Sequence, residues 1–218
     1  MESVSQDAIP PDLRPTSATG SEPVNEAKVL IRPATIADSH AIARVCVLTD
    51  NQGHSAENLL RHPELPAQVN ALPYLHLASG FGFVLVETIR VPQEKKDVGD
   101  GKRKAVVRRE KVVGYVVGTA HAKQFELETE ASWWPIMRIK YPQNLIGTPL
   151  DRYYIGLIHK DKSKHPERQG LSARINVCVN HEYQQQGCDK LLIDVAVHHL
   201  RQQGFNGYLR TASHNDDC

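Results

Sequence analysis

One stretch of the sequence, Leu171 to Leu192, combines residue types that together could hold an anionic ligand. It opens with an alternation of apolar and polar residues that is typical of a β-strand, made by Ala173, Ile175, Val177 and Val179. A polar loop with Gly187 follows, and then apolar residues recur at helical spacing, namely Leu191, Leu192, Val195, Ala196 and Leu200. In such a unit the loop N–H groups and the positive end of the helix dipole converge. The stretch therefore predicts a cradle for a diphosphate.

The sequence of this loop, VNHEYQQQGC from Val179 to Cys188, resembles the acetyl-CoA-binding signature of the GNAT superfamily of N-acetyltransferases. That signature reads Gln or Arg, two residues, Gly, one residue, then Gly or Ala, so Gln184 and Gly187 match it and Asp189 does not. The resemblance runs from about Val29 to the C-terminus, and it is carried further by residues 42–51, 63–66, 113–115, 133–135 and 140–142. Within the superfamily the chain is similar to the branch of the acetyltransferase-like C-terminal domain of O-GlcNAcases.

The resemblance implies a fold of the α/β (α+β) class, with a GNAT-like mixed β-sheet that splays between its fourth and fifth strands and is flanked by helices. It also implies acetyl-CoA as co-substrate and a primary amine as acceptor, which attacks the thioester directly in a ternary complex. The backbone N–H of Val177 would stabilise the oxyanion, and Val179 would hold the pantetheine arm. The residues around the diphosphate would be Gln184, Gln185, Gln186, Gly187, Cys188, Asp189 and Lys190.

Asp189 is the first departure from the family pattern. An acidic side chain in the first turn of the helix would stabilise the empty helix, but it would also lie near the bound phosphates. Like charges ~4 Å apart repel by ~1 kcal/mol in water and by ~4 kcal/mol at an effective dielectric constant of 20. Because Lys190 offsets only part of this repulsion, we expect acetyl-CoA to bind more weakly than is usual for the family.

The strand before the loop is the second departure, because it carries no carboxylate that could act as a base. In the related branch the places of Asn176 and Cys178 commonly hold a His and an Asp. His181 lies in the loop itself and is the first candidate for a substitute base, with His121 and His159 as the alternatives.

The third departure follows a predicted fifth strand at residues 207–211. Family members continue into a helix with a tyrosine that protonates the CoA thiolate, and then into two more strands. This sequence ends at Cys218, so we expect that helix, its general acid and those strands to be missing. The fifth strand would keep an unpaired edge, with Tyr208 and Leu209, that invites dimerisation. A catalytically inactive GNAT-like module that binds CoA or a protein, and a truncated fragment, are therefore the alternatives to an active enzyme.

Two segments and one domain are expected along the chain. Residues 1–27, rich in proline and small polar residues, predict a disordered tail, and residues 28–218 predict a single GNAT-like domain. Within it, residues 94–110 predict a charged surface loop. From Glu94 to Lys111 the sequence has eight basic and four acidic residues, which favours a solvated hairpin extension, with a nuclear-import or anion-binding patch as the alternative.

The remaining elements follow from local patterns. Thr35 and Asp38 have the spacing of a capping box before an amphipathic helix over 36–49, and Ser55 predicts a short second helix through residue 60. A polar turn between the two helices, with Gly53 and His54, can face a substrate. Strands are predicted at 28–31, 82–90 and 111–120, a helix interrupted near Trp133 at 122–140, and a loop-rich region around an apolar piece at 142–170.

Composition excludes several classes of function. The chain has 218 residues and a formal net charge of +1, which argues against a general nucleic-acid-binding protein. Its four cysteines form no CxxC pair, and His159, Asp161 and His165 have no third ligand at a suitable spacing, so no metal site is expected. Neither a leader sequence nor a membrane-spanning run is visible, which predicts a cytoplasmic protein, with the nucleus as the alternative.

Two of the cysteines, Cys178 and Cys188, lie in the segment of the candidate site and could in principle act as nucleophiles. Cys178, in the predicted strand, is expected to be a small buried apolar residue. Cys188 is predicted to lie at a helix N-terminus, which lowers the pKa of a thiol, so it is the better candidate for a reactive cysteine.

Overall fold

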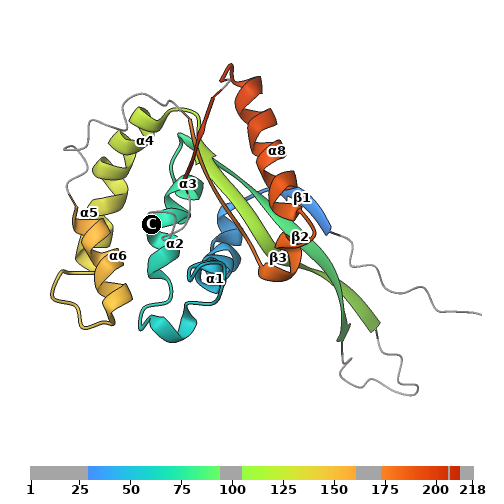
Figure 1. Ribbon diagram of the computed structural model, residues 1–218, viewed down its shortest axis with the longest axis horizontal. Coiled ribbons are helices and arrows are strands. Elements are labelled where there is room, and N and C mark those ends of the chain that lie inside the picture. The colour runs from blue at the N-terminus through green and yellow to red at the C-terminus, as the bar shows by residue number, and fades with distance from the viewer. Residues whose placement is uncertain (1–28, 94–104, 161–172, 206, 212–218) are drawn as a thin grey trace, which may run out of the picture.

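The computed structural model describes residues 29–93, 105–160, 173–205 and 207–211. A five-stranded sheet in the order β1-β2-β3-β4-β5 runs through these residues (Figure 1). The first four strands pair antiparallel, whereas the fifth is parallel to the fourth. The strands are β1 (Val29–Pro33), β2 (Gly80–Gln93), β3 (Ala105–Thr119), β4 (Arg174–Val179) and β5 (Leu209–Thr211). The structure confirms the predicted mixed sheet flanked by helices.

The helices cover both faces of the sheet (Figure 1). One face is covered by α8 (Cys188–Gln202). The other face is covered by α1 (Ser39–Thr49), α2 (Leu65–Asn70) and α3 (Leu72–His76). The connection from β3 to β4 adds α4 (Ala122–Glu128), a π-helical turn (Thr129–Trp133), α5 (Trp134–Lys140) and α6 (Pro149–His159). Short helical turns are found at Ile36–Asp38, Glu57–Leu59 and, as α7, at His181–Gln184.

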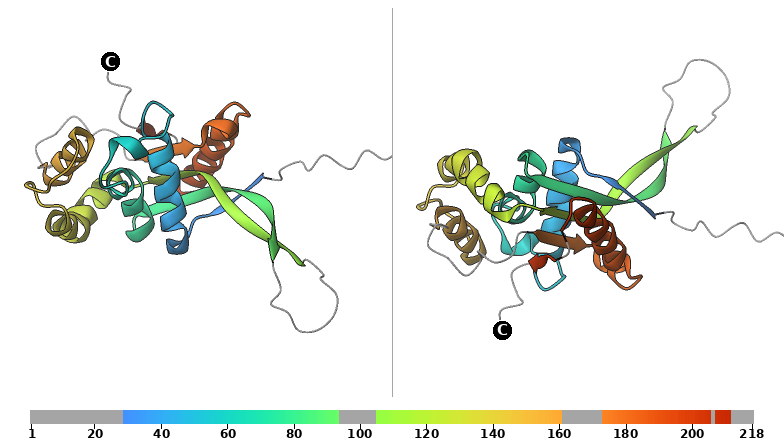
Figure 2. Two further views of the ribbon diagram at one scale, coloured as in Figure 1. Left: turned by 90° about the horizontal axis from the view of Figure 1, so that it is seen from below. Right: turned by 90° about the horizontal axis from the view of Figure 1, so that it is seen from above.

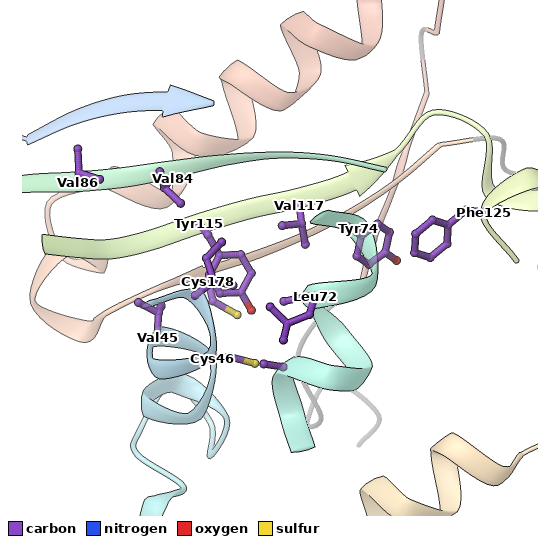
Figure 3. Close-up of a cluster of buried hydrophobic side chains, with 13 residues drawn as sticks. Val45, Cys46, Leu72, Tyr74, Val84, Val86, Tyr115, Val117, Phe125 and Cys178 are labelled. Carbon is purple, nitrogen blue, oxygen red and sulfur yellow. The ribbon is translucent and has the colours of Figure 1, made fainter. Parts of the chain in front are cut away.

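Alternate side chains of β4 enter two different cores, because successive residues of a strand point to opposite faces. On the α8 face the cluster includes Ile175, Val177, Val179, Leu192, Ala196 and Leu200. On the α1 face Cys178 packs among Val45, Cys46, Leu72 and Tyr115 (Figure 3). β4 is therefore buried on both sides, and only its end toward β5 and the following turn can meet a ligand.

The start of α1 confirms the predicted capping box. Asp38 accepts hydrogen bonds from the Thr35 amide at 2.8 Å and from both terminal nitrogens of Arg32 at 2.9 Å. This guanidinium lowers the pKa of the Asp38 carboxyl group to about 2. A single-turn 3-10 helix at Ile36–Asp38 precedes α1. The predicted helix over 36–49 therefore has the correct bounds, but it consists of a 3-10 turn followed by an α-helix.

The hairpin of β2 and β3 is longer than the sequence pattern predicted. β2 continues to Gln93 and β3 begins at Ala105, so residues 105–110 of the predicted charged loop belong to a strand. The outer part of the two strands projects away from the helices (Figure 2). Among the described residues this outer part pairs only within the hairpin, since β1 reaches β2 only as far as Glu87. The charged composition of this segment predicted a loop because a strand that leaves the core need not show an apolar alternation.

The connection between β3 and β4 corrects two predictions. The predicted interruption near Trp133 is a π-helical turn inside one continuous helical run, and Trp134 next to it is buried. Residues 142–170 were expected to be loop-rich, but Pro149–His159 forms α6. The side chain of Thr148 accepts from the amide of Asp151 at 3.1 Å and completes a capping box with it, with proline in the first turn.

Several predictions lie outside the described residues. These are the disordered tail at 1–27, the part of the charged loop at 94–104, and the pairing of His165 and Asp161 with His159. Among the described helices, none combines the length and the apolar composition that a bilayer crossing requires.

Candidate functional site

The register of β3 and β4 determines which backbone groups of β4 face the β5 side. The amide of Asn180 donates to the carbonyl of Val113 at 2.9 Å. Residues in an antiparallel pair alternate between bonding to the partner and facing away from it. The N–H groups of Val177 and Val179 are therefore turned away from β3. Within the described residues β5 pairs with β4 only as far as Asn176, so both valines lie beyond the last such pair.

The turn after β4 is more helical than the open loop that the sequence predicted. α7 occupies His181–Gln184, and the amides of Gln186 and Gly187 donate to the carbonyls of Tyr183 and Gln184 at 3.2 and 3.0 Å. These two amides are used by the chain itself. Within the expected cradle, an anion would instead meet the first turn of α8, where N–H groups precede the first intrahelical hydrogen bond.

Gly187 allows the chain to pass from this turn into α8. It is the N-cap residue, with φ of +73°, a left-handed conformation that favours glycine. A Cβ atom built on Gly187 would meet no atom within 4 Å, so the space beside it is open. The N–H groups that follow belong to Cys188 and Asp189. The start of α8 therefore combines open space, helix-terminal N–H groups and the positive end of a 15-residue helix.

Two side chains of the turn hold it against the sheet. The amide nitrogen of Gln184 donates to the carbonyl of Val179 at 2.6 Å, which ties the turn to the end of β4. Tyr183 is buried, and burial, together with the nearby carboxylate of Glu87 on β2, raises the pKa of Tyr183 to about 12. Gln184 therefore acts as a brace for the loop. The side chains of Gln185 and Gln186 are exposed, and Gln186 donates to the carbonyl of Glu182 at 3.0 Å.

A second turn, distant in sequence, lies against this one. The imidazole rings of His54 and His181 have centroids 5.8 Å apart, and a Cβ on Gly53 would lie 3.8 Å from the side-chain oxygen of Gln184. The predicted polar turn after α1 thus reaches the predicted binding loop. Both histidines are exposed, and the Gln185 side chain lies 3.2 Å from Nε2 of His181.

The two alternative histidine bases lie elsewhere. His121 follows β3 and packs edge-on against Phe205, with centroids 5.0 Å apart. His159 ends α6, and its Nε2 lies 2.8 Å from the carbonyl of Tyr141. Of the three candidates, His181 is the one that belongs to the turn after β4.

Cys188 is not the reactive thiol that its helix N-terminus suggested. It is buried in the core under α8, and burial, followed by the charge of Asp189, raises the pKa of the thiol above its ordinary value. Desolvation outweighs the helix dipole here because the thiolate would lose its water. Cys178 is buried as predicted. In the described residues Cys46, Cys178 and Cys188 form no disulfide, and no cluster of three metal-ligating side chains occurs there.

Asp189 and Lys190 occupy the first turn of α8, as the sequence predicted. The carboxylate is half-buried and the lysine is exposed. The amide of Lys190 donates to the carbonyl of Gly187 at 3.1 Å, so it is engaged within the chain. Of the segment from Gln184 to Lys190, the Cys188 and Asp189 amides and the exposed side chains are therefore the groups best placed for an anion.

No protein-family model matches the chain. The structure of SsHAT, a GNAT-type acetyltransferase, has a TM-score of 0.63 and 24% sequence identity, over 83% of this chain and 80% of SsHAT. The chain has the GNAT fold. A ribosomal-protein-alanine N-acetyltransferase from Brucella melitensis biovar Abortus 2308 is 12% identical over 87% of this chain and 84% of that chain; its TM-score of 0.39 is too low to support an argument. At these identities the GNAT likeness concerns the fold, and function must be argued from the site.

Sequence reasoning missed one functional candidate, Asp50. It lies at the end of α1 and is buried, with a carboxylate oxygen that accepts from the Tyr154 hydroxyl at 2.6 Å. Tyr154 belongs to α6, the helix that the sequence pattern did not predict. The only local signal was an acidic residue directly before a polar turn, and it says nothing about burial.

Proposed function

We propose that this protein is an acetyl-CoA-dependent N-acetyltransferase that transfers an acetyl group to a primary amine by direct attack in a ternary complex. One observation carries the proposal: in a GNAT fold, β4 passes through the turn into α8 with open space at Gly187 and helix-terminal N–H groups beside it. This is the place where a strand edge and a helix N-terminus can hold a thioester and a diphosphate together.

The residues present fit acetyl-CoA in distinct roles. The diphosphate would be held by the amides at the start of α8, with Gln185, Gln186 and Lys190 around it. The pantetheine arm would lie along the Val179 end of β4, and Val177 would offer its N–H to the thioester carbonyl as that oxygen gains charge. Acetyl-CoA supplies the activated acetyl group. Elsewhere, removal of one oxyanion donor costs ~2.7–4 kcal/mol of barrier, so this N–H would be a major contribution.

Finer assignments remain predictions. His181 is the proposed base of the turn, the similarity to the O-GlcNAcase-associated branch rests on sequence motifs, and a dimer through the β5 edge is supported by the exposure of Tyr208 beside that strand. A catalytically inactive module that binds CoA is the competing proposal. It is favoured by β4, which carries Asn176 and Cys178 and no carboxylate that could act as a base.

Binding and transfer can be tested with a matched pair of glycines. Gly187 and Gly204 lie at opposite ends of α8, both at positive φ, +73° and +86°, and both with open space for a Cβ. Gly187→Ala and Gly204→Ala therefore impose similar backbone strain. We expect calorimetry to show acetyl-CoA binding to wild type and to Gly204→Ala, and binding at least tenfold weaker in Gly187→Ala. A thiol-release assay with a panel of amines then reports transfer.

The two readouts separate the competing proposals. Binding of acetyl-CoA without release of thiol above the buffer rate would favour the inactive module. Equal affinity of the two glycine variants, or no binding to wild type, would overturn the proposed cofactor site.

A further inference from the structure

Asp50 has a free carboxylate oxygen in the interior of the protein. The residue is 3% exposed, Oδ1 accepts from the Tyr154 hydroxyl, and Oδ2 is a buried atom without a hydrogen-bond partner. Buried polar atoms are nearly always paired, and an unpaired carboxylate oxygen is costly to keep. A group that such a fold retains at this cost is a candidate for function.

The position of Asp50 relates it to β4. Asp50 is close enough to Cys46 for its charge to raise the pKa of that thiol. Cys46 and Cys178 are in turn both close enough to Tyr115 to raise the pKa of its hydroxyl, and the Cys178 sulfur lies beside that hydroxyl (Figure 3). Cys178 lies between Val177 and Val179 on β4. Asp50 is thus on the α1 side of the strand end where the thioester is proposed to bind.

The α1 side of β4 is the side that carries the turn in contact with the proposed cofactor turn. The opposite face of β4 is filled by α8, against which the side chains of Val177 and Val179 pack. On the α1 side, Asp50 directly precedes the turn Asn51–His54, which contacts the proposed cofactor turn through Gly53 and His54. Asp50 therefore directly adjoins, along the chain, the turn that contacts the proposed cofactor turn.

We infer that Asp50 is the carboxylate that receives the acceptor: its free Oδ2 binds the ammonium group of a cationic primary amine and takes one proton from it. This inference rests on the proposed acetyl transfer. The amine nitrogen then attacks the thioester carbon, so that a C–N bond forms and the C–S bond breaks. His181, the proposed base of the turn, takes the second proton of the nitrogen and passes it to the CoA thiolate, which leaves as thiol. Asp50 releases its proton to solvent when the product departs.

The electrostatic surroundings suit this role. The groups that face Asp50 are the Tyr154 hydroxyl from α6 and the Cys46 thiol from α1, with Tyr115 and Cys178 behind that thiol. Burial raises the pKa of Tyr154, Cys46 and Tyr115, so these three groups are neutral at pH 7, and among the described residues no lysine or arginine pairs with Asp50. Burial raises the pKa of its carboxyl group to about 6, while the Tyr154 hydrogen bond opposes this rise. The group is therefore mostly ionised at pH 7 and able to accept a proton, as a base should be.

Access to the oxygen requires the neighbouring turn to move. Gln52 has φ of +52° and is the one non-glycine residue with positive φ among the described residues. Such backbone strain is concentrated at switch regions and ligand clamps. The Asn51–His54 turn is therefore the segment that yields when the acceptor enters.

The test compares two isomeric amines, 2-phenylethylamine, which is protonated at pH 7, and 4-ethylaniline, which is neutral there, together with spermidine and a lysine-containing peptide. Asp50→Asn keeps an oxygen for the Tyr154 hydroxyl but cannot accept a proton. We expect it to bind acetyl-CoA with wild-type affinity by calorimetry. Its kcat/KM should fall at least 100-fold with the protonated amines and less than fivefold with 4-ethylaniline.

The pH profile gives a readout that a structural role would not move. In wild type, kcat/KM with 2-phenylethylamine should fall below about pH 6 as Asp50 becomes protonated. Tyr154→Phe removes the hydrogen bond that lowers this pKa, so the acidic limb should move to higher pH. Tyr141→Phe is the matched control, because it loses a comparable buried hydrogen bond, 2.8 Å to Glu64, on the neighbouring α5–α6 connection. The acidic limb of the Tyr141→Phe profile should stay at the wild-type pH. The profile of Asp50→Asn should have no acidic limb.

The outcomes separate this inference from the proposed function. If wild type acetylates amines and Asp50→Asn does so equally well, or keeps the acidic limb, Asp50 is not the acceptor carboxylate, while acetyl transfer stands. Wild type that prefers 4-ethylaniline to its protonated isomer would also overturn the role of Asp50. Wild type that binds acetyl-CoA but acetylates none of the amines contradicts both proposals. Thermal unfolding of each variant shows that a loss of rate is not a loss of fold.

Discussion

The imidazole rings of His54 and His181 lie with their centroids 5.8 Å apart, which joins the turn after α1 to the turn after β4. The local sequence of each turn does not determine where the turn lies in the fold. The contact is set by α1 and β4, which pack through Cys46 and Cys178 in one core. Whatever binds at the end of β4 is therefore exposed to two histidines from distant parts of the chain.

His181→Asn should lower kcat/KM for acetyl transfer by ~10²-fold or more if this imidazole moves a proton in the reaction, since general bases typically contribute ~10²–10⁴. The matched control is His198→Asn on α8. Both imidazoles are exposed and lie near a glutamine four residues later, at 3.2 Å for His181 and 3.0 Å for His198. Steady-state kinetics with acetyl-CoA and an amine decide the matter. Equal values of kcat/KM in the two variants would mean that His181 does not take part in the reaction.

Asp189→Asn should tighten acetyl-CoA binding by ~5-fold or more, because it removes a like charge that repels the diphosphate by ~1 kcal/mol or more. The same change should lower the stability of the empty protein by ~0.3–1 kcal/mol, since an acidic side chain in the first turn favours the helix dipole. Asp194→Asn, two turns from the helix start and exposed, is the control for both effects. Calorimetric titration with acetyl-CoA and chemical denaturation measure them. Unchanged affinity would mean that the carboxylate faces away from the ligand.

Asp151→Asn should destabilise the fold by ~3 kcal/mol, because Asp151 is buried and its carboxylate accepts from the amides of Arg61, His62 and Thr148 at 2.6–3.1 Å. These hydrogen bonds lower its pKa against the opposing effect of burial. For a carboxylate with a depressed pKa, the stabilisation is present above the unfolded-state pKa and is lost as pH falls through the folded value. Denaturant melts at pH 7 and at pH 3 should differ less in the variant than in wild type.

Asp50→Asn should stabilise the protein at pH 7 to 8. The folded-state pKa of Asp50 is raised to about 6 from an ordinary 3.8, so its contribution is fully present below pH ~4 and is lost as pH rises through 6. Two pKa units correspond to ~3 kcal/mol, which the amide variant would not lose. Thermal unfolding of wild type should therefore show a falling melting temperature from pH 5 to 7, relative to the variant. Parallel curves for the two proteins would mean that the buried carboxylate carries no ionisation cost.

Much of the site could be predicted because it is continuous in sequence. The alternation at Ile175, Val177 and Val179, followed by Gly187 and an amphipathic helix, specifies a strand, a turn and a helix by local rules. The spacing of Thr35 and Asp38 likewise predicted the capping box correctly. These elements depend on side chains within a few positions of one another, so tertiary packing does not override the pattern.

The parts that were missed depend on contacts between distant segments. The burial of Asp50 requires α6, and α6 was not predicted because Gly156 lies within it and the apolar run is short. The pair Thr148 and Asp151, with a proline at the helix start, was a local signal for α6 that could have been read. The low reactivity of Cys188 could not be predicted from its place at a helix N-terminus, because it depends on burial in the core beneath α8.

The helical excursion between β3 and β4 has a kinetic consequence. These strands are neighbours in the sheet, yet the chain leaves for three helices and a π-helical turn before it returns. Ends joined by a long connection meet rarely unless the connection is already compact, and contacts of high sequence separation slow folding. The strand that carries the candidate site should therefore be among the last to dock during refolding, and hydrogen exchange should find its amides protected later than those of the β2–β3 hairpin.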